Sequence, residues 1–288
     1  MDYQKWLIAM SWNKENVIWV CSRNAGKSFL VSVFTQARAL LYPKSKIYIL
    51  SVAAKQSMDT FGVMESIAKH QIKTLISDNT VFWDEVYKQK ADSDGFTHDA
   101  KKGCNVSLMN GSFIATVSGT EKTVRGKRSN LNIYDEAGFI SKGFFDVTEP
   151  FCTQSSDFKT GANYDAEVYP QEAPTTRMYV GSASDTNSQF YAKYKEGVKQ
   201  MLAGNDKYFV ADLSCEIPLH PTMNGKPYAA LLSQDEIDRK MRENEIIALR
   251  EYYNIFDRFD LEDSVITRSD IMDNEKMFLP SCSWGGKK

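Results

Sequence analysis

Hydrophobic positions in the first eighty residues alternate between two spacings, which indicates alternating strands and helices. The continuous apolar runs VIWVC at 17–21 and IYILSV at 47–52 predict buried strands. Apolar residues recur at helical spacing over 29–41 and 55–76, and a shorter amphipathic stretch at 3–10 begins the chain. This alternation favours a parallel sheet with helices on both faces.

The middle of the chain adds a hairpin to this scheme. The dipeptide Asn110-Gly111 separates the apolar runs NVSLM and SFIATVS, which predicts two antiparallel strands joined by a type I′ turn. The other predicted segments are strands at 131–136 and 177–184, a helix at 189–202, a loop or lid at 77–102 and a long surface loop at 152–176.

The sequence changes character near residue 208. Ser233 with Glu236 forms a capping-box pattern, which predicts one long charged helix that ends at about Asn254. We therefore expect a main core at 1–207, a small linker or lid subdomain at 208–270, and a tail or the start of a further linker at 271–288.

Composition limits the partner and the compartment. The 288 residues are 42% hydrophobic, which suffices for a core, and no apolar run approaches the roughly 20 residues of a membrane helix. The net charge is −2, so any contact with nucleic acid must come from local basic patches. The short apolar runs favour a soluble protein. Five cysteines, odd in number and without CxxC spacing, favour a reducing, cytosolic compartment.

The segment CSRNAGKS at 21–28 is the strongest chemical signal. Against the pattern GxxxxGK[ST] it matches at Gly26, Lys27 and Ser28, while Cys21 replaces the first glycine. Lys27 would reach the β and γ phosphates of a nucleotide, and the Ser28 hydroxyl would bind Mg²⁺. The residues expected to surround the phosphates are Ser22, Arg23, Asn24, Ala25, Gly26, Lys27 and Ser28. A plain Gly-Lys-Ser turn is the alternative, and the preceding strand and following helix favour the phosphate loop.

The segment LNIYDEAG at 131–138 supplies the acids that such a site requires. Asp135 is predicted to hold Mg²⁺ through water from the neighbouring position in the sheet, and Glu136 to polarise the attacking water. An exposed Asp-Glu pair at a strand end is the alternative interpretation. The joint occurrence with the phosphate loop favours a hydrolase that uses ATP and Mg²⁺.

Phosphoryl transfer also requires cations at the γ phosphate. Arg23 could supply one within the subunit, and Arg125 could reach the nucleotide of a neighbouring subunit. For Arg125, Lys127 and Arg128, a solvated basic turn or a contact with DNA phosphates is an equally good interpretation from charge alone. Lys122, Lys127 and Arg128 are the candidate DNA contacts.

Several segments combine into one recognisable pattern. They are DYQ at 2–4, SRNAGKS at 22–28, NGS at 110–112, VRG at 124–126, LNIYDEAG at 131–138, GSAS at 181–184 with Asn187, Phe190 and Tyr191, and ALREYYNIF at 248–256. Together they resemble the ATPase portion of tailed-bacteriophage terminase large subunits, from the start of the chain to about residue 260. That family commonly lacks the first glycine of the phosphate loop and has an arginine near its start, as at Cys21 to Arg23.

The resemblance implies a fold and further site residues. The fold would be α/β, a P-loop NTPase of ASCE/RecA-like type with a mainly parallel central sheet flanked by helices, an inserted β-hairpin and a small C-terminal linker subdomain. The ATPase core would be the segment 1–207. Gln4 would recognise adenine, with Tyr3 or Trp6 near the base. The segment Ser182, Ala183 and Ser184 would couple the γ-phosphate state to subdomain movement. Arg125 would act in trans in a ring.

The implied function is an ATP-hydrolysing motor that moves double-stranded DNA into a viral procapsid through the portal. Its expected partners are double-stranded DNA, the portal protein, the small terminase subunit and further copies in a homo-oligomeric ring, with no membrane, in the host cell cytoplasm. Nuclease activity is not predicted, because Asp257, Asp260, Glu262 and Asp263 fit a solvated charge run in a linker. A helicase-like ATPase and a nucleotide-gated docking module are the alternatives.

Overall fold

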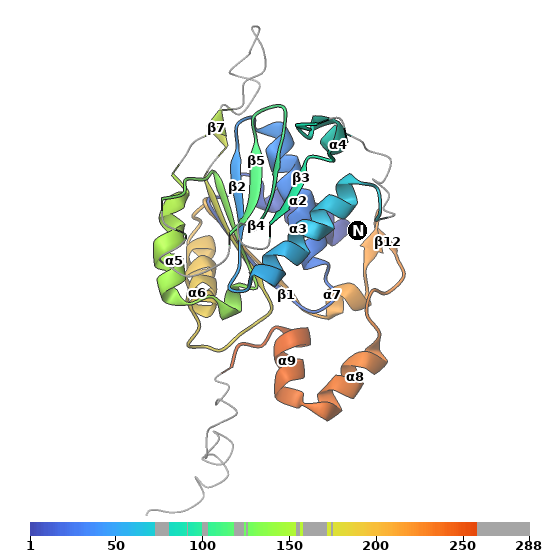
Figure 1. Ribbon diagram of the computed structural model, residues 1–288. Coiled ribbons are helices and arrows are strands. Elements are labelled where there is room, and N and C mark those ends of the chain that lie inside the picture. Colours follow the sequence, from blue (N-terminus) through green and yellow to red (C-terminus); the bar gives the residue numbers. More distant parts are fainter. Residues whose placement is uncertain are drawn as a thin grey trace, which may run out of the picture. The chain divides into compact units, whose positions relative to one another are not determined.

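The computed structural model describes residues 1–72, 81–90, 92–99, 103–117, 124, 126–153, 156–157, 172–173 and 175–257. Within these residues the main element is an eight-stranded sheet with the order β10-β1-β9-β6-β2-β5-β4-β3 (Figure 1). Its strands are β1 (Asn16–Cys21), β2 (Lys46–Leu50), β3 (Phe96–Asp99), β4 (Gly103–Ser107), β5 (Phe113–Val117), β6 (Leu131–Asp135), β9 (Thr176–Gly181) and β10 (Tyr208–Leu213).

The six strands from β10 to β5 are parallel, whereas β4 and β3 are antiparallel additions at one edge. The expected strands at 17–21, 47–52, 131–136 and 177–184 all lie in the parallel part. The prediction of a mainly parallel sheet with an inserted hairpin is therefore confirmed.

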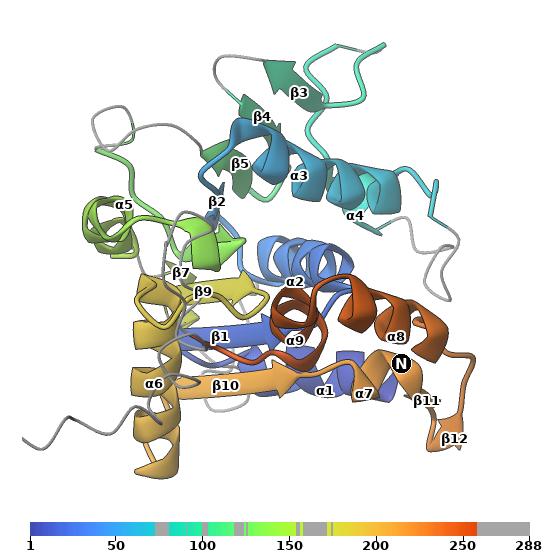
Figure 2. The ribbon, with the colours of Figure 1, turned by 90° about the horizontal axis from the view of Figure 1, so that it is seen from below.

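Helices cover both faces of the sheet, and the burial of β1 shows why (Figure 2). Val17, Trp19 and Cys21 pack with α1 (Asp2–Ser11), α2 (Lys27–Leu41) and α3 (Ala54–Ala68), and the intervening Ile18 and Val20 pack on the opposite face with α5 (Lys142–Thr148) and α6 (Gln189–Leu202). Because both faces are covered, the strand is a continuous apolar run without alternation.

The hairpin between β4 and β5 forms, but its turn is not type I′. Gly111 has φ +84°, whereas Asn110 is not among the residues with positive φ. Leu108 and Ser112 close a three-residue connection in which the Leu108 N–H donates to the Ser112 carbonyl at 2.8 Å and the Gly111 N–H to the Leu108 carbonyl at 3.0 Å. The Asn110 side chain accepts from the Ser112 N–H, so it stabilises the alternative turn.

Two segments that lack a clear pattern contain regular structure. The predicted lid at 77–102 includes α4 (Val81–Glu85) and β3, whose Phe96 packs against the main core. The predicted surface loop at 152–176 includes the short antiparallel pair β7 (Ser156–Asp157) and β8 (Glu172–Ala173). Four-residue and two-residue strands are too short to give a periodic signal.

The C-terminal part differs from prediction in two respects. The expected boundary at 207/208 falls immediately before β10, which pairs in parallel with β1, so the core extends at least to Leu213. The expected long helix is two helices, α8 (Gln234–Glu243) and α9 (Glu245–Tyr253), because Asn244 is extended and its side chain caps α9. The predicted boundary at residue 270 lies outside the described residues.

A small third core joins these last helices to α7 (Glu216–Leu219). It consists of Cys215, Leu232, Ile237, Ala248 and Tyr252. Ser233 caps α8 as expected, its hydroxyl accepting from the Glu236 N–H at 3.2 Å. In the described part of the chain, no helix combines the length and the apolar character needed to span a membrane.

Candidate functional site

The segment between β1 and α2 is a tight loop that ends in a left-handed glycine. Gly26 has φ +77° and directly precedes Lys27, the first residue of α2, and its carbonyl accepts the Leu30 N–H at 2.9 Å. An L-residue other than glycine rarely adopts this conformation, so the sequence requires glycine here. The N-terminus of α2 therefore follows β1 after a short loop, which is the arrangement of a phosphate loop. Within that loop, the Ser22 N–H donates to the Leu213 carbonyl and the Arg23 N–H to the Glu251 carbonyl.

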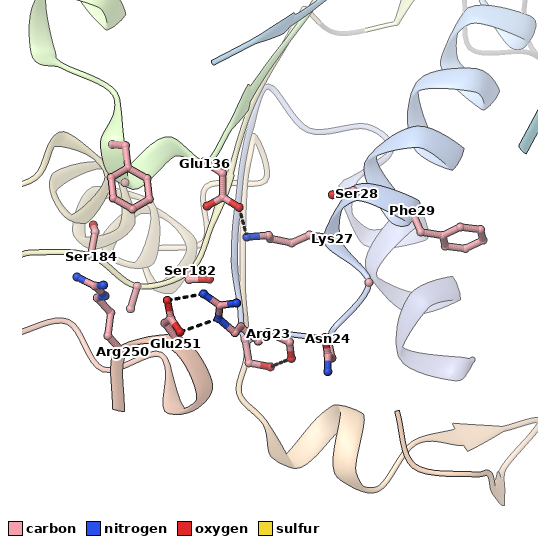
Figure 3. Close-up of a pocket in the computed structure, with 15 residues that line it drawn as sticks. Arg23, Asn24, Lys27, Ser28, Phe29, Glu136, Ser182, Ser184, Arg250 and Glu251 are labelled. Atoms are coloured by element: carbon pink, nitrogen blue, oxygen red, sulfur yellow. Dashed lines mark hydrogen bonds and ion pairs between the residues drawn. The ribbon is translucent and has the colours of Figure 1, made fainter. Parts of the chain in front are cut away.

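This loop forms one wall of a cavity of about 490 Å³ (Figure 3). The other walls are the segment after β6, the segment after β9, and α9. The lining residues are Ser22, Arg23, Asn24, Gly26, Lys27, Ser28 and Phe29, with Glu136, Gly138 and Phe139, with Ser182, Ala183 and Ser184, and with Arg250 and Glu251.

Lys27 and Glu136 meet across this cavity. The Lys27 Nζ lies 2.7 Å from the Glu136 Oε1, and both side chains remain partly exposed. Strand β9 lies between β1 and β6, so the expectation that Asp135 and Glu136 follow the strand adjacent to β1 was wrong. The contact nevertheless forms, because the Lys27 side chain reaches across the end of β9.

Glu136 has an unusual backbone conformation for its residue type. Its φ of 50° and ψ of 49° place it in the left-handed region, which costs a non-glycine residue roughly 1–2 kcal/mol. This conformation turns the chain sharply after β6 and directs the carboxylate towards Lys27. Strain at one carboxylate beside a cavity is typical of a functional position.

Asp135 lies beneath the cavity lining and is only 4% exposed. Its carboxylate accepts from the Thr60 hydroxyl on α3 and from the Glu136 N–H. Burial raises the pKa of Asp135, and the Thr60 hydrogen bond opposes this effect. The Asp135 carboxylate and the Ser28 hydroxyl are oxygen ligands of the kind that suits Mg²⁺ held mainly by water, phosphate and one carboxylate.

The raised pKa of Asp135 predicts a pH-dependent stability difference. The cost of burying the ionised carboxylate is absent below its ordinary pKa of 3.8 and is complete above its raised pKa. Asp135→Asn removes this cost, so we expect the nucleotide-free variant to unfold at a higher denaturant concentration than wild type at about pH 7. The difference should shrink as the pH falls towards about 4, whereas the exposed control Asp206→Asn should show no such trend. A pH-independent difference would contradict the assignment.

Arg23 is engaged by an acid rather than directed at the centre of the cavity. Its Nε and Nη2 donate to the two carboxylate oxygens of Glu251 on α9 at 2.6 and 2.8 Å. This pair raises the pKa of Arg23, chiefly through the hydrogen bond. The Arg23 side chain is 58% exposed, so the pair contributes little stability. The predicted contact of Arg23 with phosphates stays a prediction, and it requires Glu251 to release the guanidinium.

The end of β9 connects the two sides of the cavity. The Ser182 hydroxyl donates to the carbonyl of Cys21 at the end of β1, at 3.1 Å. Ser184 shares a hydrogen bond of 2.7 Å with Ser188, the residue that caps α6. A Cβ at Gly138 would lie only 2.8 Å from the Ser184 Cβ, so only glycine allows this approach. A displacement after β6 would therefore reach Ser184.

Gln4 on α1 and Ala25 within the loop do not line the cavity. The Tyr3 hydroxyl donates to the Ala25 carbonyl at 3.0 Å, and the Gln4 Nε2 donates to the Tyr3 oxygen at 3.4 Å. Trp6 is 47% exposed and packs edge-on against Phe209. Gln4 thus lies directly against the phosphate loop, since a Cβ at Gly26 would lie 3.4 Å from the Gln4 Nε2. Its role towards adenine stays a prediction.

The basic turn before β6 is described only in part. Arg125 and Lys122 lie outside the described residues. The Lys127 ammonium lies 5.3 Å from the centroid of the Tyr48 ring, and Arg128 is exposed. Their role as DNA contacts stays a prediction.

Sequence reasoning missed several residues that line the cavity: Phe29, Gly138, Phe139, Arg250 and Glu251. Gly138 and Phe139 follow the Asp-Glu pair after one alanine. Arg250 and Glu251 lie in ALREYYNIF at 248–256, which resembles a segment of the terminase family. That resemblance could have pointed to both residues, but it did not assign either of them to the nucleotide site. Thr60, which donates to Asp135, had no sequence signal.

The fold matches solved structures of phage large terminases. A large terminase from a thermophilic bacteriophage, in complex with ADP, gives a TM-score of 0.58 at 10% identity, with 88% of this chain and 52% of that chain covered. The HK97 bacteriophage large terminase gives 0.59 at 13% identity, with 89% and 50% covered. The Thermus phage P74-26 large terminase ATPase domain gives 0.52 at 13% identity, with 87% and 92% covered.

The chain spans about half the length of the first two of these proteins and corresponds to nearly the whole of the third, an isolated ATPase domain. No family model matches the sequence, and no curated protein matches it. The likeness in structure shows that this chain shares the fold of these terminase ATPase domains.

Proposed function

We propose that this protein is an ATP-hydrolysing motor of viral DNA packaging. The observation that supports this best is the 2.7 Å contact between Lys27 and Glu136 within a cavity lined by a phosphate loop. It brings together a cation suited to β and γ phosphates and a carboxylate suited to activating water. The fold shared with terminase ATPase domains favours packaging over other uses of such a site.

Each residue of the cavity would have a separate role in ATP hydrolysis. The N-terminus of α2 would bind the phosphates, and Lys27 would transfer from Glu136 to the terminal phosphates. Glu136, once released, would accept a proton from the attacking water. Ser28 and Asp135 would hold Mg²⁺, which when bound neutralises charge that develops on the phosphates.

The remaining parts of the proposal concern the assembly. Arg125 of a neighbouring subunit would complete the site in a ring, and Ser182 to Ser184 would transmit the nucleotide state to the C-terminal helices. The ring would act with the portal and the small terminase subunit in the host cytoplasm. Contacts with double-stranded DNA would involve phosphates, and binding would therefore weaken with salt and ignore sequence.

Displacement of a third strand from duplex DNA tests the motor function. We expect the protein with Mg²⁺ and ATP to release a triplex-forming oligonucleotide from a duplex, because a translocating ring displaces what lies in the groove ahead of it. The two duplex strands should stay paired, whereas a helicase would separate them. ATP hydrolysis with neither triplex release nor strand separation would contradict the motor, whereas ATP binding without any hydrolysis would favour the docking module.

A further inference from the structure

Arg250 contributes a charge to the nucleotide cavity from a distant part of the chain. It lies on α9, and its side chain lines the same cavity as Lys27 and Glu136. Figure 3 shows its guanidinium beside Ser184, on the wall that faces Lys27. The phosphate loop lines one side of the cavity, and Arg250 lines it from α9 together with Ser184.

The charged side chains of the cavity wall favour an anion. Among the described lining residues, Arg23, Lys27 and Arg250 are basic, and Glu136 and Glu251 are acidic. The wall therefore has a formal charge of +1 before any nucleotide binds, and Arg250 is one of its three basic residues. Such a surplus in a partly enclosed cavity attracts a ligand with several negative charges.

The position of Arg250 is set by backbone contacts of α9 with the phosphate loop and the sheet. The Arg23 N–H donates to the Glu251 carbonyl at 2.9 Å, and the Cys215 N–H to the Tyr252 carbonyl at 2.7 Å. Asn254, which ends α9, is 5% exposed and donates to the Val20 carbonyl and to Asp212. These contacts fix the helix against the end of β1, so Arg250 reaches the cavity from a defined direction.

We propose that Arg250 binds the terminal phosphate of the nucleotide within its own subunit and thereby reports the triphosphate state to the helices α8 and α9. This inference rests on the proposed ATP site. The water that Glu136 activates must lie at the terminal phosphate, and Arg250 lines the cavity together with Glu136 and Ser184. An arginine there matches the oxygens of a terminal phosphate, whereas ADP ends one phosphate closer to the loop and leaves Arg250 without that contact.

Nucleotide affinities of Arg250→Ala test the inference. We expect the affinity for ATPγS to fall about tenfold or more, because a charge-assisted hydrogen bond is lost. The affinity for ADP should change by less than about twofold, because its phosphates lie out of reach of Arg250. Fluorescence titration with each nucleotide in the presence of Mg²⁺ measures the ratio of the ATPγS affinity to the ADP affinity. The control Arg239→Ala removes the same charge from α8, where the side chain is exposed and outside the cavity lining, and should leave both affinities unchanged.

The other possible outcomes distinguish the inference from its alternatives. An equal loss of ATPγS and ADP affinity would show a structural role and overturn the proposal, as would no change in either. If Arg250→Ala unfolds, Arg250→Gln keeps the length without the charge and should show the same selective loss, while Arg250→Lys should retain part of the ATPγS preference. A wild-type protein that binds neither nucleotide would refute the ATP site itself, which is a different failure.

Discussion

Glu136→Gln is expected to bind Mg·ATP with nearly wild-type affinity and to hydrolyse it about 10² to 10⁴ times more slowly. Glutamine has the same shape as glutamate and its Oε1 can still accept from Lys27, so the cavity keeps its form. It cannot accept a proton from water at neutral pH, so the chemical step loses its base. Its backbone would have to adopt the same left-handed conformation, at a similar cost.

Phosphate release under saturating ATP measures the rate, and titration with a fluorescent analogue measures the affinity. Glu196→Gln is a matched control, because Glu196 is exposed on α6 and its carboxylate accepts a hydrogen bond from the Gln200 side chain on the same helix. Turnover at the wild-type rate in Glu136→Gln would remove the proposed base. Loss of binding together with turnover would instead show that the charge of Glu136 organises the cavity.

The parts of the site that the sequence predicted are those determined by a few consecutive residues. The loop before Lys27 and the strand end at Glu136 follow from local requirements: a left-handed glycine before a helix, and carboxylates after a buried strand. Glu136 lies within 2.7 Å of Lys27 although the assumed strand order was wrong. Both segments follow parallel strands, whose carboxyl ends lie at one edge of the sheet whatever their order.

The parts that could not be predicted depend on packing between distant segments. Whether Arg23 faces phosphate or Glu251 depends on where α9 packs. The periodicity of a helix predicts the helix but not its position against the phosphate loop. The place of β10 in the sheet depends on its pairing with β1. The paired residues Asn16 and Tyr208 are 192 positions apart in the sequence. A capping residue explains why one long helix was predicted where α8 and α9 form. Asn244 can either continue a helix or cap the start of the next one.

Lys27→Ala is expected to weaken Mg·ATP binding by about 100-fold or more, and hydrolysis should fall with it. A lysine bound to phosphate provides charge-assisted hydrogen bonds, each of which contributes about 1.5–3 kcal/mol, or roughly tenfold to a hundredfold in affinity. The substitution also leaves Glu136 without its cation, so a carboxylate would then face a polyanion. Both effects act in the same direction. The exposed Lys199→Ala on α6 is the control for the loss of one positive charge, and it should bind as wild type does.

The double variant Lys27→Ala/Glu136→Gln separates these two effects. If repulsion from the unpaired carboxylate accounts for part of the loss, the double variant should bind Mg·ATP more tightly than Lys27→Ala alone, although neither should hydrolyse it. Isothermal titration of the wild type, the two single variants and the double variant gives the coupling energy of the pair. Additive effects of the two substitutions would mean that Lys27 and Glu136 act independently on the nucleotide, and the contact of 2.7 Å between them would then have no part in binding.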